Sequence, residues 1–74
     1  MTNAEKADPV WIGARLRELR EERGLKQYWV AMQLGTTPNA LCQVEQGRYR
    51  SAVLTVARVL DVLDVSLAEF FAGD

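Results

Sequence analysis

The stretch QYWVAMQLGTTPNALCQV, residues 27–44, decides the fold of this chain. Before Gly35, apolar residues recur at helical spacing: Val30, Ala31 and Leu34. Such spacing is typical of the buried face of a helix, and glycine permits the left-handed backbone of a sharp turn. Thr37 can cap a second helix, and Pro38 at its first position loses no hydrogen bond that the helix would have made. These residues predict two short helices joined by a tight turn.

The two helices, residues 27–34 and about 38–45, are expected to cross at a steep angle. Ala31 is small at a position where a large side chain would push the second helix away. Leu41 and Val44 can fill the angle between the helices. This pattern is typical of a helix-turn-helix, whose second helix enters the major groove of DNA.

Similar start and stop signals predict helices on both sides of this pair. Asp8 and Pro9 start a helix over about residues 9–23, and Gly24 ends it. Ser51 can cap a fourth helix, which carries a broad apolar stripe.

The end of the chain predicts a fifth helix over about residues 67–72. Ser66 and Glu69 form a capping box, in which each side chain bonds the backbone N–H of the other residue. Val65 and Phe70 stand at the positions of a hydrophobic staple.

The predicted fold is all-α, with five short helices in one domain over residues 9–74 and a flexible N-terminal arm at residues 1–8. The 74 residues include no His and one Cys. Paired nucleophiles, disulfides and zinc sites are therefore not expected. We expect no enzymatic activity, no cofactor, no metal and no small-molecule ligand. The lone Cys, with neither a secretory signal nor a span of ~20 apolar residues, favours a cytoplasmic protein outside the membrane.

The net charge of −1 conceals an uneven distribution along the chain. Residues 10–50 carry seven basic and four acidic side chains, a net charge of +3. Residues 51–74 carry one basic and four acidic side chains, a net charge of −3. A basic helix-turn-helix region with an acidic rear is compatible with binding to DNA.

The sequence resembles the Cro and phage-repressor-like helix-turn-helix family, also called the xenobiotic-response-element type. The resemblance covers about residues 12–71 and is carried by three segments: IGARLRELREERGLKQ, LGTTPNALCQVEQGR and VLDVSLAEFF. It implies a lambda-repressor-like fold that binds double-stranded DNA. Small members of the family include phage repressors, controller proteins of restriction–modification systems and antitoxins.

The resemblance also implies roles for single residues. The DNA-facing side of the recognition helix would hold Thr37, Pro38, Asn39, Cys42 and Gln43. We expect Asn39 and Gln43 to read bases, because carboxamides can form two hydrogen bonds to adenine. We expect phosphate contacts from five residues: Gln27, Tyr28, Arg48, Tyr49 and Arg50. Arg20 and Glu45 match a family pair that forms a partly buried salt bridge.

The apolar surface of the last two helices favours a homodimer, because it exceeds what one core-facing stripe requires. The residues expected at the dimer interface are Val59, Val62, Leu67, Phe70 and Phe71.

The function expected from the sequence is that of a sequence-specific transcriptional regulator. A homodimer would bind a palindromic operator, as a controller protein or phage-type repressor does. The alternative is a protein-interaction module, such as an antitoxin or anti-activator, that uses the same fold and the unusual aromatic residues Tyr28 and Trp29.

Overall fold

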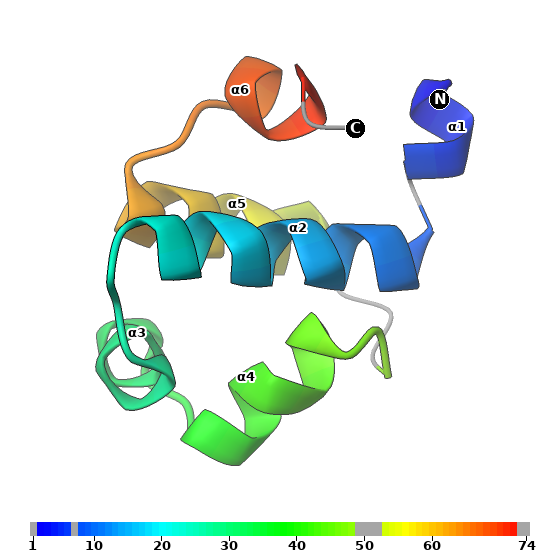
Figure 1. Cartoon of the computed structure of the whole chain (residues 1–74). Helices are drawn as coiled ribbons and strands as arrows, with labels where there is room; N and C mark the ends of the chain where they lie inside the picture. The colour runs from blue at the N-terminus through cyan, green and yellow to red at the C-terminus, as the bar shows by residue number, and fades with distance from the viewer. Residues whose placement is uncertain (1, 7, 49–52, 73–74) are drawn as a thin grey trace.

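The computed structural model describes residues 2–6, 8–48 and 53–72. All regular structure in these ranges is helical (Figure 1). The helices are α1 (Asn3–Lys6), α2 (Pro9–Glu22), α3 (Gln27–Leu34), α4 (Pro38–Glu45), α5 (Val53–Leu63) and α6 (Leu67–Ala72). The all-α prediction is confirmed, and each of the five predicted helices is present. None of the described helices is both long enough and apolar enough to span a membrane.

The helix boundaries follow from the capping residues. The Asp8 carboxylate accepts a hydrogen bond from the Trp11 backbone N–H at 3.4 Å, and Thr37 Oγ1 accepts one from the Ala40 N–H at 3.1 Å. Gly35 ends α3 in the left-handed conformation, with φ +71°. Ser51, the cap predicted for α5, lies outside the described residues.

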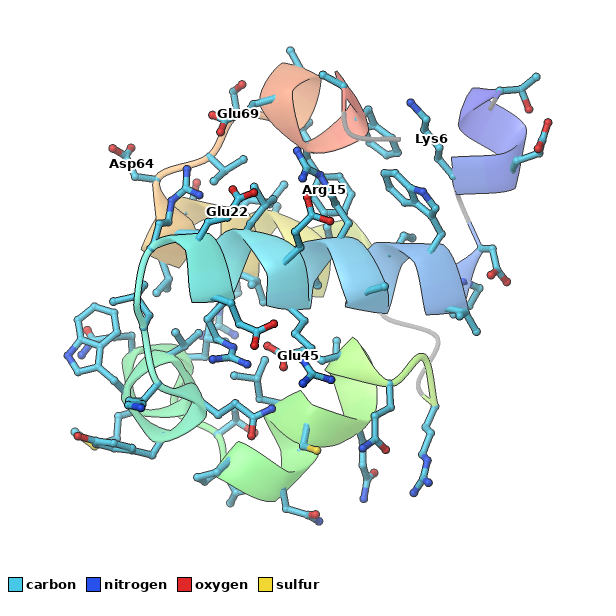
Figure 2. The ribbon with its side chains drawn as sticks, in the orientation of Figure 1. Lys6, Arg15, Glu22, Glu45, Asp64 and Glu69 are labelled. Carbon is cyan, nitrogen blue, oxygen red and sulfur yellow. The ribbon has the colours of Figure 1, made fainter. Side chains whose placement is uncertain are left out.

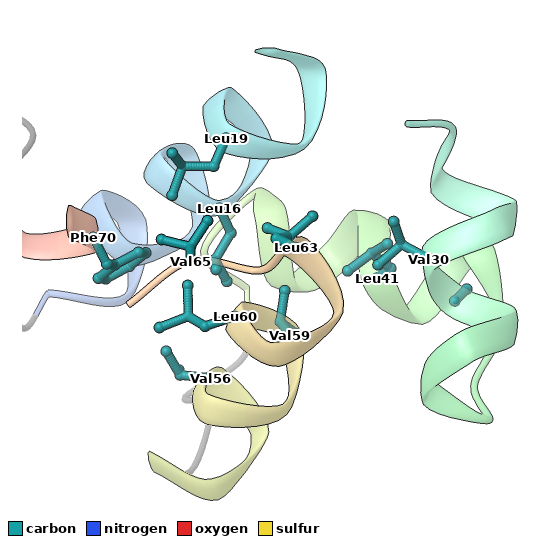
Figure 3. Packing of buried hydrophobic residues seen from close by; sticks show 11 residues of the cluster. Leu16, Leu19, Val30, Leu41, Val56, Val59, Leu60, Leu63, Val65 and Phe70 are labelled. Carbon is teal, nitrogen blue, oxygen red and sulfur yellow. The ribbon is translucent and has the colours of Figure 1, made fainter. Parts of the chain in front are cut away.

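Helices α2 and α5 pack against each other and form the middle of the molecule (Figure 1). Helices α3 and α4 lie on one side of this layer, and α1 and α6 lie on the other. The buried side chains join the two sides into one core (Figure 3). The largest fully buried side chains are Phe70, Leu16, Leu19, Leu63 and Val30.

Helix α2 approaches the end of α4 so closely that only glycine fits at the contact. A Cβ atom on Gly13 would lie 2.3 Å from the Val44 carbonyl oxygen and 2.7 Å from that of Glu45. Both neighbouring atoms belong to the backbone, so they cannot move away as a side chain could. The absence of a side chain at Gly13 therefore sets how closely α4 is held against α2.

The predicted N-terminal arm contains the short helix α1. Thr2 Oγ1 accepts a hydrogen bond from the Glu5 N–H at 3.3 Å, and Glu5 Oε1 accepts one from the Thr2 N–H at 3.4 Å. This reciprocal capping box is a local sequence signal for α1, a helix that was not among those predicted. Lys6 is buried, donates to the Phe71 carbonyl oxygen, and places Nζ 5.7 Å from the centre of the Trp11 ring. The flexibility of the arm stays a prediction.

The predicted capping box, at the start of α6, forms only in part. Ser66 Oγ accepts a hydrogen bond from the Glu69 N–H at 3.1 Å. The Glu69 carboxylate does not bond back to Ser66, because it lies 3.3 Å from Arg23 Nη2 instead. Val65 and Phe70 are both buried beside this turn, as a hydrophobic staple requires.

Candidate nucleic-acid interface

The first turn of α4 is the most exposed part of the predicted recognition helix. Thr37, Pro38 and Asn39 are exposed, whereas Cys42 and Gln43 are half-buried. In Figure 1 this helix lies at the outer edge of the molecule, on the side of α2 that is opposite to α6. The structure therefore presents the start of α4 to an external partner.

The opposite end of α4 is anchored by the predicted Arg20–Glu45 ion pair, which is present and nearly buried. Arg20 Nε lies 2.7 Å from Glu45 Oε2, and Arg20 Nη2 lies 3.1 Å from Oε1. The side chains are only 10% and 3% exposed. The hydrogen bond with Glu45 raises the pKa of the Arg20 guanidinium, although burial acts in the opposite direction. Arg20 Nη1 also donates to the Leu25 carbonyl oxygen at 2.7 Å, which fixes the segment before α3.

The Gln27 side chain joins this ion pair. Its Nε2 donates to Glu45 Oε1 at 2.8 Å, so one N–H of the carboxamide is engaged inside the protein. From the sequence only a phosphate contact was expected of Gln27. The link to Glu45 depends on tertiary packing and has no local signal. The neighbouring Tyr28 is exposed.

An open groove of about 620 Å³ lies between α2 and the starts of α3 and α4. Three basic side chains line it: Arg17, Arg20 and Lys26. Arg17 and Lys26 are exposed. Lys26 is the N-cap residue of α3 and its side chain forms no capping hydrogen bond, so the first-turn N–H groups of α3 keep their capacity to bind an anion. Arg17 and Lys26 are not among the DNA contacts expected from the sequence.

Two of the seven basic residues in the predicted basic region are bound to α5 and α6 and not to this groove. Figure 2 shows Arg15 on the side of α2 that faces α6. Arg15 Nε donates to the Phe70 carbonyl oxygen at 3.1 Å, and Arg15 Nη2 donates to the Glu69 carbonyl oxygen at the same distance. Arg23 Nε donates to the Leu63 carbonyl oxygen at 2.7 Å. These arginines cap the ends of α5 and α6, so the charge count along the sequence overstates the basic charge near α4.

The other predicted contact residues have mixed positions. Arg48 follows α4 and is exposed, whereas Tyr49 and Arg50 lie outside the described residues. Cys42 Sγ accepts a hydrogen bond from Gln46 Nε2 at 3.4 Å.

Two residues of the predicted dimer interface cannot contribute surface to it. Val59 and Phe70 are buried in the core: Val59 lies beside Leu41 and Val44 of α4, and Phe70 packs against Trp11 of α2. Val62 and Phe71 are half-buried, and Leu67 is 58% exposed. Phe71 also stacks on Trp11, with ring centres 6.0 Å apart. The predicted interface is thereby reduced to Val62, Leu67 and Phe71.

Comparison with known proteins identifies the family of the chain. The model of a helix-turn-helix domain matches residues 11–70. The HTH-type transcriptional regulator PuuR of Escherichia coli (strain K12) is 38% identical over 60 residues, which are 81% of this chain and 32% of that protein. The HTH-type transcriptional regulator RamB of Mycobacterium tuberculosis (strain ATCC 25618 / H37Rv) is 37% identical over 63 residues, 85% of this chain and 13% of that protein.

A third relative is a phage protein. The ImmF control region 10 kDa protein of Bacillus phage phi105 is 32% identical over 56 residues, 76% of this chain and 62% of that protein. No solved structure matches the chain. The chain thus spans about a third or less of the two bacterial regulators. The family resemblance inferred from the sequence is confirmed: the chain belongs to the helix-turn-helix domain family.

Proposed function

We propose that this chain is a sequence-specific DNA-binding module of a transcriptional regulator and that it inserts α4 into the major groove. The main support is that the first turn of α4 is exposed and lies beside a groove lined by Arg17 and Lys26. The acidic side chains labelled at Glu22, Asp64 and Glu69 lie on the other side of α2, away from the phosphates in this arrangement (Figure 2). Three relatives that are named as regulators or as a control region protein support the proposal.

The proposed phosphate contacts come from the groove and from Arg48, which lies three residues after the end of α4. On the α3 side these are the first-turn N–H groups, Gln27 and Tyr28, with Arg17 and Lys26 added by their position in the groove. On the other side Arg48 is exposed at the end of α4. Such contacts position the protein on DNA without reading sequence.

Base reading is proposed for the face of α4 between these phosphate contacts. Asn39 and Gln43 would each form two hydrogen bonds to an adenine in the major groove. Thr37, at the start of the helix, would contact a phosphate or a thymine methyl group. Pro38 and Cys42 would add apolar contacts.

We also propose that the functional unit is a homodimer on a palindromic operator, as expected of a controller protein or phage-type repressor. Its two copies of α4 would enter successive major grooves about 34 Å apart. The exposed Leu67, with the half-buried Val62 and Phe71, supports a two-fold contact. A sedimentation run at micromolar concentration should show twice the 8.3 kDa mass of one chain. A single 8.3 kDa species would contradict the dimer.

Selection of bound sites from random DNA tests DNA recognition directly. We expect enrichment of one palindromic site. Gln43→Ala should then cost about 1–3 kcal/mol on that site and little on random DNA. Gln33→Ala is the matched control, because Gln33 is an exposed glutamine on α3 outside the proposed reading face. Equal losses on both DNAs would remove Gln43 from base reading, and a failure to enrich any site would contradict DNA recognition.

A second candidate function is that of a protein-interaction module. It is favoured by an exposed apolar face on α3, formed by Tyr28, Trp29 and Met32. Exposed aromatic side chains are enriched at protein interfaces. If no DNA site is enriched while Trp29→Ala abolishes binding to a partner protein, this second function would replace the first.

A further inference from the structure

Glu45 has more hydrogen-bonding partners than a simple ion pair needs. Its two carboxylate oxygens accept hydrogen bonds from Arg20 Nε, Arg20 Nη2 and Gln27 Nε2, at 2.7, 3.1 and 2.8 Å. The partners come from α2 and from the first residue of α3, whereas Glu45 is the last residue of α4. In Figure 2 Glu45 is labelled in the space between α2 and α4.

The chemistry of the carboxylate decides which end of the Gln27 carboxamide faces it. An ionised carboxylate accepts hydrogen bonds and cannot donate them, so Gln27 must present its NH₂ group and not its oxygen. An NH₂ group carries two hydrogens, and the second remains for another acceptor. Gln27 itself lines the groove beside α4. A DNA phosphate oxygen is also an acceptor, so one NH₂ group can join the two anions.

We propose that Glu45 is a positioning residue for DNA binding: its contact with Gln27 Nε2 directs the second N–H of that carboxamide towards a DNA phosphate at the start of α3. The proposal rests on the proposed DNA-binding function. Arg20 completes the arrangement, because its Nη1 donates to the Leu25 carbonyl oxygen and so fixes the segment that leads into α3. Preorganisation of this kind lowers the entropic cost of forming the phosphate contact.

A merely structural role for Glu45 makes a different prediction. Loss of stability alone would lower the amount of folded protein, but the folded molecules would keep every phosphate contact. A positioning role predicts the selective loss of one contact. The two roles can therefore be separated by replacing single phosphates in the DNA rather than by measuring affinity alone.

The experiment uses the selected DNA site with one neutral methylphosphonate at a time. For the unmodified protein, a methylphosphonate at the DNA position that faces the start of α3 should weaken binding about tenfold. This is the loss expected for a hydrogen bond to a charged group. Gln27→Ala should reduce the penalty at this phosphate alone and thereby identify it. Glu45→Gln keeps the size of the side chain but can present either an oxygen or an NH₂ group, so it should reduce the same penalty, to a value close to that of Gln27→Ala.

The remaining phosphates are the internal control, since Glu45→Gln should leave the penalties near Arg48 unchanged. If Glu45→Gln does not fold, Glu45→Asp replaces it: the shorter side chain keeps a carboxylate for Arg20 and draws it back from Gln27. An undiminished penalty at the α3 phosphate in the folded variant would overturn the positioning role and leave the proposed function intact. Absence of DNA binding by the unmodified protein would overturn both.

Discussion

The two sides of the α2–α5 layer use arginine in different ways. On the α6 side, Arg15 and Arg23 donate to the carbonyl oxygens of Phe70, Glu69 and Leu63. On the α4 side, Arg20 anchors the recognition helix through Glu45, while Arg17 remains exposed at the groove.

This difference shows that the position of a basic residue matters more than its count. Arg15, Arg17, Arg20 and Arg23 all belong to α2 or directly follow it, yet they face three environments. One side of the molecule uses positive charge to hold the last helix in place. The other keeps positive charge accessible, which is what binding to phosphate requires.

The largest effect is expected from breaking the anchor on the α4 side. Glu45→Ala leaves the Arg20 guanidinium buried without its partner, which should cost about 3–5 kcal/mol in the free energy of unfolding. Urea unfolding measures this loss. The double variant Arg20→Met with Glu45→Leu is the control, since replacing both charges with apolar groups should recover most of the stability. A double variant as unstable as Glu45→Ala would show that the pair does more than neutralise a buried charge.

The pH dependence of this anchor follows from the raised pKa of Arg20. A raised pKa in the folded state contributes stability that is fully present below the ordinary pKa of arginine and is lost only above it. The Arg20 contribution should therefore stay constant between neutral pH and about pH 10. This expectation would be contradicted if the unmodified protein and Glu45→Ala came to have the same free energy of unfolding within that pH range.

The next largest effect is expected at the contact between α2 and α4. Gly13→Ala places a Cβ against two backbone carbonyl oxygens and should cost about 2–3 kcal/mol. Gly24→Ala is the matched control, because its Cβ would meet nothing within 4 Å and only the positive φ is penalised, by about 1 kcal/mol. Gly13→Ala should also weaken DNA binding by the folded protein, since α4 must shift. Equal losses of stability in the two variants would contradict the close approach.

The sequence predicts the helices well because their ends depend on local chemistry. Asp8 and Thr37 accept the first-turn hydrogen bonds expected of them, and Gly35 adopts the left-handed turn. The part that local chemistry could not predict is pairing across the fold. Glu69 has two available partners, a backbone N–H three residues away and an arginine 46 residues away, and only packing brings the arginine close.

The candidate site shows the same division between local and tertiary information. The exposure of Asn39 follows from helical spacing, and the Arg20–Glu45 pair follows from the family resemblance. The contact of Gln27 with Glu45 follows from neither source, since the two residues belong to different helices, α3 and α4. Val59 and Phe70 were assigned to a surface because the apolar stripe does not reveal which of its residues face the core.

A smaller effect is expected on the α6 side. Arg15→Ala removes the hydrogen bonds to the Phe70 and Glu69 carbonyl oxygens and should cost about 1–2 kcal/mol of stability. The salt dependence of DNA binding should not change, because Arg15 faces away from the groove. Thermal unfolding and a salt titration of the DNA affinity give the two measurements. A reduced salt dependence would place Arg15 at the DNA and contradict the division between the two sides.

The smallest effect on stability is expected at Arg48, which is exposed and forms no ion pair with any described residue. Arg48→Ala should change the free energy of unfolding by less than about 0.5 kcal/mol. It should weaken binding to all DNA sequences and reduce the slope of log affinity against log salt by about 0.9, as expected for one lost phosphate contact. Arg48→Ala is thus the reverse of Arg15→Ala in both measurements. If both variants altered the salt slope, the basic charge would act through the overall field of the protein, and the distinction between the α4 and α6 sides would fail.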